Sequence, residues 1–475
     1  TQPFAFTCEG GLIKSRSTFI MQPGQALELL NFEPDIKGGY RRISGFRRQI
    51  NHIVPQTSAS TEKVLMVAFF NNNILAARGE KIFSSASTEL ATAITSSATM
   101  SGSGTITVDS TSGFSSSGTL QINSEIFTYT GKTSTTFTGV TRATSSTSAA
   151  AHAVDDAVSE SWTERDTGRT SASKYTFERF NFDGNDKIIV TDGTNDPTVF
   201  NTSLAATDVT ESSVEGAKFV TAFKSHMFYA GMSSTPQELV FSQPFDEDAF
   251  NSGSGAGSIK IDDTIVGMKA FRNDLFVFCE NRIFKLSGTS SSDFAITPVT
   301  RNIGCVNGDT IQEFAGDLIF LGPDGLRTVA GTARIGDVEL GTISANVQSI
   351  FDDNLVDSAL FESVVIPDKT QYRIFFSKTG TSEDSTKGVI CVMKGQTFEF
   401  SELRGIKPSA TDTFVEEGNV LVLHGGFDGY IHRQEKGDDF DGTSISGRYR
   451  SPDLTFNDPG IRKHMQRVIL NYEPE

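Results

Sequence analysis

The chain has 475 residues, a formal net charge of -17 and a hydrophobic fraction of 37 %. An acidic chain lacks the basic surface that general binding to nucleic acid requires. No apolar run reaches the roughly 18 to 20 residues that cross a bilayer, so no membrane-spanning segment is expected. The 38 Phe and 43 Gly, with abundant Ser and Thr, favour an all-β chain of short strands and tight turns.

Residues 1–60 are predicted to form an N-terminal β-hairpin segment, with one short helix at 25–30. The segment holds the one basic patch of the chain, formed by Lys37, Arg41, Arg42, Arg47 and Arg48. One interpretation is a hairpin whose arginines make local ion pairs. The other is a subunit interface, because the forked guanidinium suits bidentate pairing with acidic loops of a neighbour.

A recurring unit follows, in which an apolar strand, a short Gly/Asn/Asp turn and a second apolar strand repeat. Its copies lie at 64–83, 180–190, 219–230, 266–286, 311–326, 361–376 and 414–431. From the second copy on, the spacing is roughly 40 to 50 residues, which is typical of propeller blades. We therefore predict a β-propeller-like body of six or seven blades over 61–84 and 161–435, with a pair of β-sandwiches as the alternative.

The first two copies are separated by a segment of different composition, residues 85–160, which is rich in Ser, Thr and Gly. Apolar and polar residues alternate there over 105–108, 119–122, 125–129 and 136–140. This alternation predicts a small inserted β-module in a blade loop.

The end of the chain, residues 436–475, is predicted to form strands that leave the propeller, including a last strand over 467–472. A second short helix is expected over 340–352. The four cysteines, Cys8, Cys279, Cys305 and Cys391, are widely spaced and are expected to be free thiols.

The sequence contains no strong local motif for phosphate binding, metal binding or catalysis. The sequence Gly131-Lys132-Thr133 lacks the earlier glycine and the following helix of a phosphate-binding loop, so a turn is expected. His424 and His432 flank one turn, and we expect hairpin residues there rather than a metal pair. The acids Asp438, Asp439 and Asp441 are expected to be solvated loop residues. No catalytic residue, cofactor or metal is assigned, and the chain is not expected to be an enzyme.

Three segments resemble phage tail proteins. Residues 29–32 (LLNF) with 38–46 (GGYRRISGF) are similar to the N-terminal signature of the tail nozzle and hub family, also called tail tubular protein B. Residues 105–114, 117–120, 125–131 and 137–142 resemble a β-module found within tail structural proteins. Residues 447–456 and 460–463 are similar to the strand that follows the propeller in that family.

The resemblance implies a structural subunit of the virion, made in the host cytoplasm, that forms a homohexameric ring at the distal end of a tail. Its implied partners are an adaptor or tail tube protein above, tail fibres or spikes, and DNA that passes through the lumen during ejection without sequence-specific binding. One alternative is a glycan-binding or depolymerising tail protein, which the single Trp162 and 8 Tyr disfavour. Another is a propeller hydrolase of cellular origin.

Overall fold

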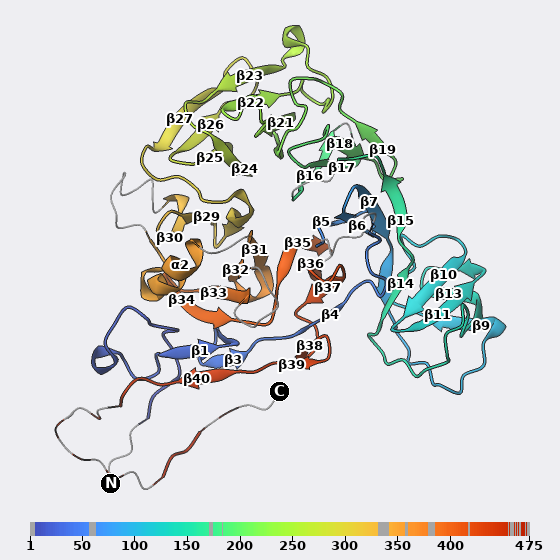
Figure 1. Ribbon diagram of the computed structural model, residues 1–475, viewed down its shortest axis with the longest axis horizontal. Helices are drawn as coiled ribbons and strands as arrows, with labels where there is room; N and C mark the ends of the chain where they lie inside the picture. The colour runs from blue at the N-terminus through green and yellow to red at the C-terminus, as the bar shows by residue number, and fades with distance from the viewer. Residues whose placement is uncertain are drawn as a thin grey trace.

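The chain is described from a computed structural model, shown in Figure 1. The residues it describes are 5–56, 63–170, 174–182, 184–330, 342–356, 360–378, 385–416 and 419–454, with 456, 460, 462, 464, 467–470 and 472.

Seven sheets follow one another around a common axis (Figure 1), and each starts with its innermost strand. The innermost strands are β5 (Met66–Phe70), β16 (Thr176–Phe182), β20 (Phe219–Phe223), β24 (Ile265–Phe271), β28 (Gln312–Phe314), β31 (Leu360–Ile366) and β35 (Pro408–Glu416). Along the ring β16 contacts β20, β20 contacts β24, β28 contacts β31 and β31 contacts β35. The ring closes because β35 of the last sheet also contacts β5 of the first. The chain is therefore a seven-bladed β-propeller, and the β-sandwich alternative is wrong.

Each innermost strand is followed by antiparallel strands that run outward, and blades are numbered here in chain order. Blade 1 adds β6 (Asn73–Arg78), β7 (Lys81–Ser85) and β15 (Thr163–Asp166), and blade 2 adds β17 (Asn185–Thr191), β18 (Thr198–Phe200) and β19 (Ala206–Asp208). Blade 3 adds β21 (His226–Ala230), β22 (Glu238–Phe241) and β23 (Gly257–Lys260), and blade 4 adds β25 (Asp274–Cys279), β26 (Ile283–Ser287) and β27 (Ala295–Thr300). Blade 5 adds β29 (Asp317–Gly322) and β30 (Gly325–Thr328), and blade 6 adds β32 (Gln371–Ser377), β33 (Thr386–Lys394) and β34 (Thr397–Leu403). Blade 7 adds β36 (Asn419–Gly426) and β37 (Ile431–Gln434). Apolar side chains between neighbouring sheets form a chain of cores, such as the one between blades 3 and 4.

Both ends of the chain are built into blades 6 and 7. Strands β1 (Glu28–Leu30) and β40 (Arg448–Arg450) extend blade 6, and β1 runs parallel to β34. Strands β4 (Phe46–Arg48), β38 (Asp439–Phe440) and β39 (Thr443–Ser444) extend blade 7. A separate hairpin joins β2 (Phe32–Pro34) to β3 (Tyr40–Arg42). The N-terminal segment thus closes the ring by completing the last blade, which leaves fewer open sheet edges.

The insert is a sheet with its own core, outside the ring beside β15 (Figure 1). It comprises β8 (Ser87–Glu89), β9 (Ser101–Thr107), β10 (Gly118–Ile122), β11 (Glu125–Tyr129), β12 (Gly131–Lys132), β13 (Thr136–Thr141) and β14 (Ala157–Glu160). A bridge between Leu90 and Val108 joins the β8 end to the β9 end, so the sheet closes on itself. The Gly131-Lys132-Thr133 motif lies at β12 and the turn that follows it. Lys132 Nζ donates to the carbonyl oxygens of Thr111 and Phe114 at 2.8 and 2.5 Å.

Helices are few among the described residues. The α-helix α2 (Gln348–Leu355) follows the short turn η5 (Ala345–Val347), within and just beyond the segment expected to be helical, whose residues 340 and 341 lie outside the described part. The other short helical turns are η1 (Thr18–Ile20), η2 (Ser252–Ser254), η3 (Gly308–Thr310) and η6 (Pro367–Lys369). None of the helices in the described chain is long and apolar enough to cross a membrane. All four cysteines are free.

Two local predictions are wrong. Residues 28–30 form β1 rather than part of a helix, because this segment pairs with β34 and β40. Residues 467–470 and 472 are not in a strand, and 471 lies outside the described residues. A β-branched run forms a strand only where another strand supplies hydrogen bonds.

Candidate functional site

The axis of the ring is crossed by charged side chains. Lys174, just before β16 of blade 2, places its Nζ 3.2 Å from Asp309 Oδ2 in η3 of blade 5 and forms an ion pair with Glu362 on β31 of blade 6. Thr411 on β35 of blade 7 donates to Glu362 Oε1 at 3.0 Å. These four residues, called the axial network below, tie blades 2, 5, 6 and 7 together.

A second contact between non-adjacent blades involves Arg179 on β16. Its Nε donates to the carbonyl oxygen of Phe69 on β5 at 2.7 Å, and its guanidinium pairs with Asp412 on β35. Asp412 also accepts the Phe69 N–H at 2.8 Å. Blades 1, 2 and 7 are therefore joined by one buried carboxylate, whose residue is only 7 % exposed.

The protonation of the axial network follows from burial. Burial and the nearby Asp309 raise the pKa of Glu362 to about 7, although Lys174 opposes the shift. Such a pKa suits a general acid. However, Glu362 is 2 % exposed, and its two oxygens are occupied by Lys174 and Thr411. The arrangement can hold blades together, and it offers no room for a reacting group at this carboxyl.

The basic residues of 37–48 fall into two groups. In the β2–β3 hairpin, Arg41 donates to Glu33 Oε1 from Nε at 3.0 Å and from Nη2 at 2.6 Å. Glu33 is 1 % exposed and also meets Lys369 Nζ at 2.7 Å and Arg373 Nη2 at 3.3 Å. Burial alone would raise the pKa of Glu33, but Arg373 and Lys369 outweigh it and lower that pKa to about 2. Lys37 is exposed at the rim of a cavity of about 330 Å³ that Arg41 also lines.

The second group lies on β4. Arg47 pairs with Asp439, and Arg48 Nε lies 3.0 Å from Asp441 Oδ2. The Arg48 guanidinium also lies 4.0 Å above the ring centre of Tyr430. The acids expected to be solvated are therefore partners of the arginines within the same chain. Arg42 lies on β3, opposite Phe32 of β2. A subunit-interface role for these basic residues stays a prediction.

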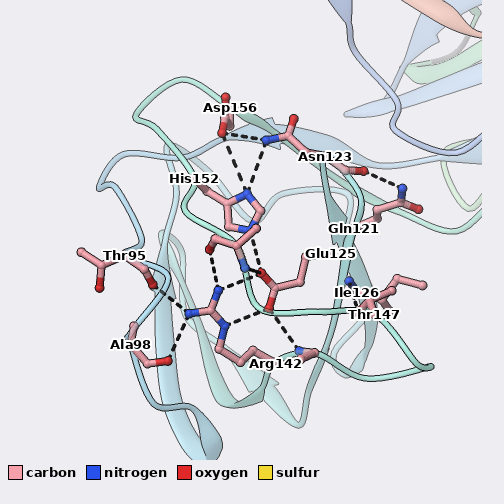
Figure 2. Close-up of polar contacts among 12 residues, drawn as sticks. Thr95, Ala98, Gln121, Asn123, Glu125, Ile126, Arg142, Thr147, His152 and Asp156 are labelled. Atoms are coloured by element: carbon pink, nitrogen blue, oxygen red, sulfur yellow. Dashed lines mark hydrogen bonds and ion pairs between the residues drawn. The ribbon is translucent and has the colours of Figure 1, made fainter.

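The insert contains a buried charged centre that sequence reasoning missed. Figure 2 shows Glu125 between Arg142 and His152. Arg142 donates to both oxygens of Glu125 at 2.8 Å, and His152 Nε2 lies 2.8 Å from Glu125 Oε2. Arg142 Nη1 donates to the carbonyl oxygens of Thr95 and Ala98, so the cluster holds the turn at 95–98 in place. Burial opposes ionisation of Glu125, but these hydrogen bonds outweigh it and lower its pKa to about 2.

The insert is attached to blade 7 at the seam, which is the place where β4 of the N-terminal segment pairs with β37 and completes that blade. Glu89 accepts from Arg433 Nη1 at 2.7 Å and from Lys436 Nζ at 2.9 Å, and both donors belong to blade 7 or its following loop. Asn51, shortly after β4, donates to the carbonyl oxygen of Ala157 at 2.7 Å. The module is thus held against blade 7 by polar contacts.

His424 and His432 stack, with ring centres 4.9 Å apart and an interplanar angle of 20°. Stacked rings direct their in-plane lone pairs along parallel planes rather than toward one point, and metal ligation needs convergence. Over the residues that the structure describes, no group of three His, Cys, Asp or Glu side chains could hold a metal ion.

Comparisons with known proteins do not identify a family for this chain. No family model matches the chain, and no curated protein matches it. Among solved structures, the Neurospora crassa Pan2 WD40 domain is 6 % identical, with 79 % of this chain and 90 % of that one covered and a TM-score of 0.36. A quinonprotein alcohol dehydrogenase-like protein from Bacteroides thetaiotaomicron is 7 % identical, with 73 % and 66 % covered and a TM-score of 0.36. The assignment to seven-bladed β-propellers rests on the order of the sheets.

Proposed function

We propose that this chain is a structural subunit of a phage tail, a ring-forming nozzle or hub protein rather than an enzyme. The observation that carries the proposal is the pairing of two segments that resemble that family and lie at opposite ends of the chain. Leu29 and Leu30 of β1 lie opposite Tyr449 and Arg448 of β40. Segments that resemble one family thus form a single unit on blade 6.

The axial network bears on how such a subunit would conduct DNA. Lys174 meets carboxylates of blades 5 and 6 across the axis, so the axis of one propeller is occupied by side chains. We therefore place the DNA path in the lumen of a ring of copies, not through each propeller. A chain with a net charge of -17 would repel the phosphate backbone and let DNA slide.

The proposed ring is homohexameric, by the resemblance, with an adaptor or tail tube protein on one side and fibres or spikes around it in the virion. Negative-stain microscopy and light scattering of the purified 51.4 kDa chain test this. Closed rings of about six copies are expected. A protein that stays monomeric at every concentration and cleaves a host polysaccharide would instead support the depolymerising alternative.

The interface role of the basic residues has a separate test. Reversal of Arg41 would disturb the buried Glu33, so a change in assembly could come from a damaged fold. Lys37 is exposed, and Lys37→Glu should weaken ring assembly while the monomer stays folded. Lys260→Glu on the exposed outer strand of blade 3 is the matched control, since it changes the net charge equally. Equal assembly of the two variants would remove Lys37 from the interface.

A further inference from the structure

The strand that closes the ring packs on two histidines. On β4, Arg48 lies opposite His432 of β37, and Phe46 lies opposite Gln434. The Phe46 ring meets His424 at a centroid distance of 5.0 Å and His432 at 4.9 Å, edge-on to both. Phe46 also stacks on Phe440 of β38 at 5.3 Å. The main apolar anchor of β4 therefore rests on a pair of titratable rings.

Both rings are buried. His424 is 2 % exposed and His432 is 3 % exposed. His432 Nε2 lies 3.1 Å from Asp428 Oδ2, whereas the Nδ1 atoms of both rings are buried without a partner among the residues that the structure describes. A second proton on His424 would therefore place a charge in a buried site with no acceptor for it.

The charged groups around the pair do not supply that acceptor. Arg48 on β4 is a cation already paired with Asp441. On the axial side His424 lies opposite Thr411, whose hydroxyl is engaged with Glu362. On the blade 6 side Arg373 donates to Gln434 at 3.2 Å. Asp428 is the carboxylate in contact, and it contacts His432.

The pH dependence follows from this geometry. Burial and the neighbouring His432 hold the pKa of His424 well below its usual 6.5, and Asp428 opposes them only in part. When β4 detaches, Phe46 no longer covers the rings, so water reaches them and His424 titrates near 6.5. Below that pH the open form binds a proton that the closed form does not, so acid favours the open form. Glu362, on the inner strand of blade 6, stays buried in this local opening.

We propose that the stacked pair of His424 and His432 makes β4 an acid-sensitive clasp, which detaches from β37 at mildly acidic pH while the other blades stay folded. The inference does not depend on the proposed ring of copies. It assigns a switch to the seam where the N-terminal segment completes blade 7.

Hydrogen–deuterium exchange with mass spectrometry tests the clasp in the full chain. Exchange in residues 43–49 at pH 7.5 and 5.5, corrected for the intrinsic rate, should rise by up to about tenfold per pH unit below 6.5, as one coupled proton requires. Residues 219–223 on β20 should show no such rise. Equal behaviour of the two peptides in the wild-type chain would overturn the proposal.

His424→Phe keeps a ring against Phe46 and removes the titrating nitrogens, so it should abolish the pH dependence in 43–49. His226→Phe is the matched control, since His226 is equally buried at 2 % but its Nδ1 lies 2.6 Å from the Ser242 carbonyl oxygen in blade 3. Full pH dependence in His424→Phe would contradict the proposal. Emission of Trp162, whose indole donates to the His52 carbonyl oxygen at 3.0 Å near the seam, checks that each variant is folded. If a variant fails to fold, the comparison of exchange in residues 43–49 and 219–223 of the wild-type chain still tests the proposal.

Discussion

At the scale of residues, the buried carboxylate of Glu125 is surrounded by several hydrogen-bond donors. Glu125 is fully buried and accepts from the Arg142 side chain and from the backbone N–H groups of Ala143 and Ala150. His152 completes the set. A buried ion pair of this kind adds little over an apolar core, but removal of one partner leaves an uncompensated charge.

Glu125→Gln should therefore lower the free energy of unfolding of the insert by about 3–5 kcal/mol, because Arg142 would stay buried without its counter-charge. The pKa of Glu125 is lowered from 4.5 to about 2, so its ionised form stabilises the fold above pH 4.5 and that contribution is lost as the pH falls toward 2. The difference between wild type and variant should narrow over the same range. Urea unfolding at pH 7 and pH 3 measures both effects.

The control for this variant is Glu164→Gln. Glu164 pairs with Lys81 on the surface and its side chain is 42 % exposed, so its loss should cost at most about 1 kcal/mol. Similar costs for the two variants would show that the buried centre of the insert is not what stabilises it.

At the scale of elements, the seam depends on how closely β4 approaches β38. Gly45, just before β4, is packed so tightly that a Cβ there would overlap the carbonyl oxygen of Asp439. A larger residue must push β38 away from β4, and with it the Asp439 that pairs with Arg47.

Gly45→Ala should destabilise the chain by about 1–3 kcal/mol, which is typical of an overpacked site. Gly118→Ala on β10 is the control, because the nearest atom to its Cβ would be a Tyr129 ring carbon at an ordinary 3.6 Å. Thermal unfolding with residue-level exchange should place the Gly45 effect in blade 7. A Gly45→Ala chain as stable as wild type would mean that β4 can shift without loss.

At the scale of the whole molecule, the axial network joins blades that are distant along the ring. Lys174→Met should leave Asp309 and Glu362 without their shared cation and lower the free energy of unfolding by about 3–5 kcal/mol. Lys285→Met is the control, since Lys285 pairs with Asp274 at 3.3 Å and its side chain is 36 % exposed. Chemical denaturation that finds the two variants equally stable would count against a role for the axial network in holding the ring together.

The repeat was readable from the sequence because each blade carries its own strands and turns in one stretch. The turn at Asn71 and Asn72, both at positive φ, is such a local signal. The exact number of blades was not readable, because blade 7 takes its fourth strand, β4, from the N-terminal end of the chain, and β1 from the same end extends blade 6. Parallel pairing of Leu30 with Glu402 has no local signature.

The charged centres were likewise predictable from the sequence only in part, because their partners lie far apart in the chain. Glu362 is a single acid within the apolar run LFESVVI; this contrast could have indicated a buried carboxylate, although Glu362 was not singled out from the sequence. Its partner Lys174 lies 188 positions away and could be found only from the closed ring. The arginines of β4 were identified, but their partners Asp439 and Asp441 were assigned to solvent because pairing across nearly the whole chain leaves no pattern.

The central claim is that seven sheets close into a ring through β4, with the axis crossed by side chains. An experimental density map of the isolated chain tests it most directly. The map should show seven sheets around one axis, β4 hydrogen-bonded to β37, and continuous density from Lys174 to Glu362. Two stacked layers of strands, or an open axis with β4 detached at neutral pH, would contradict it.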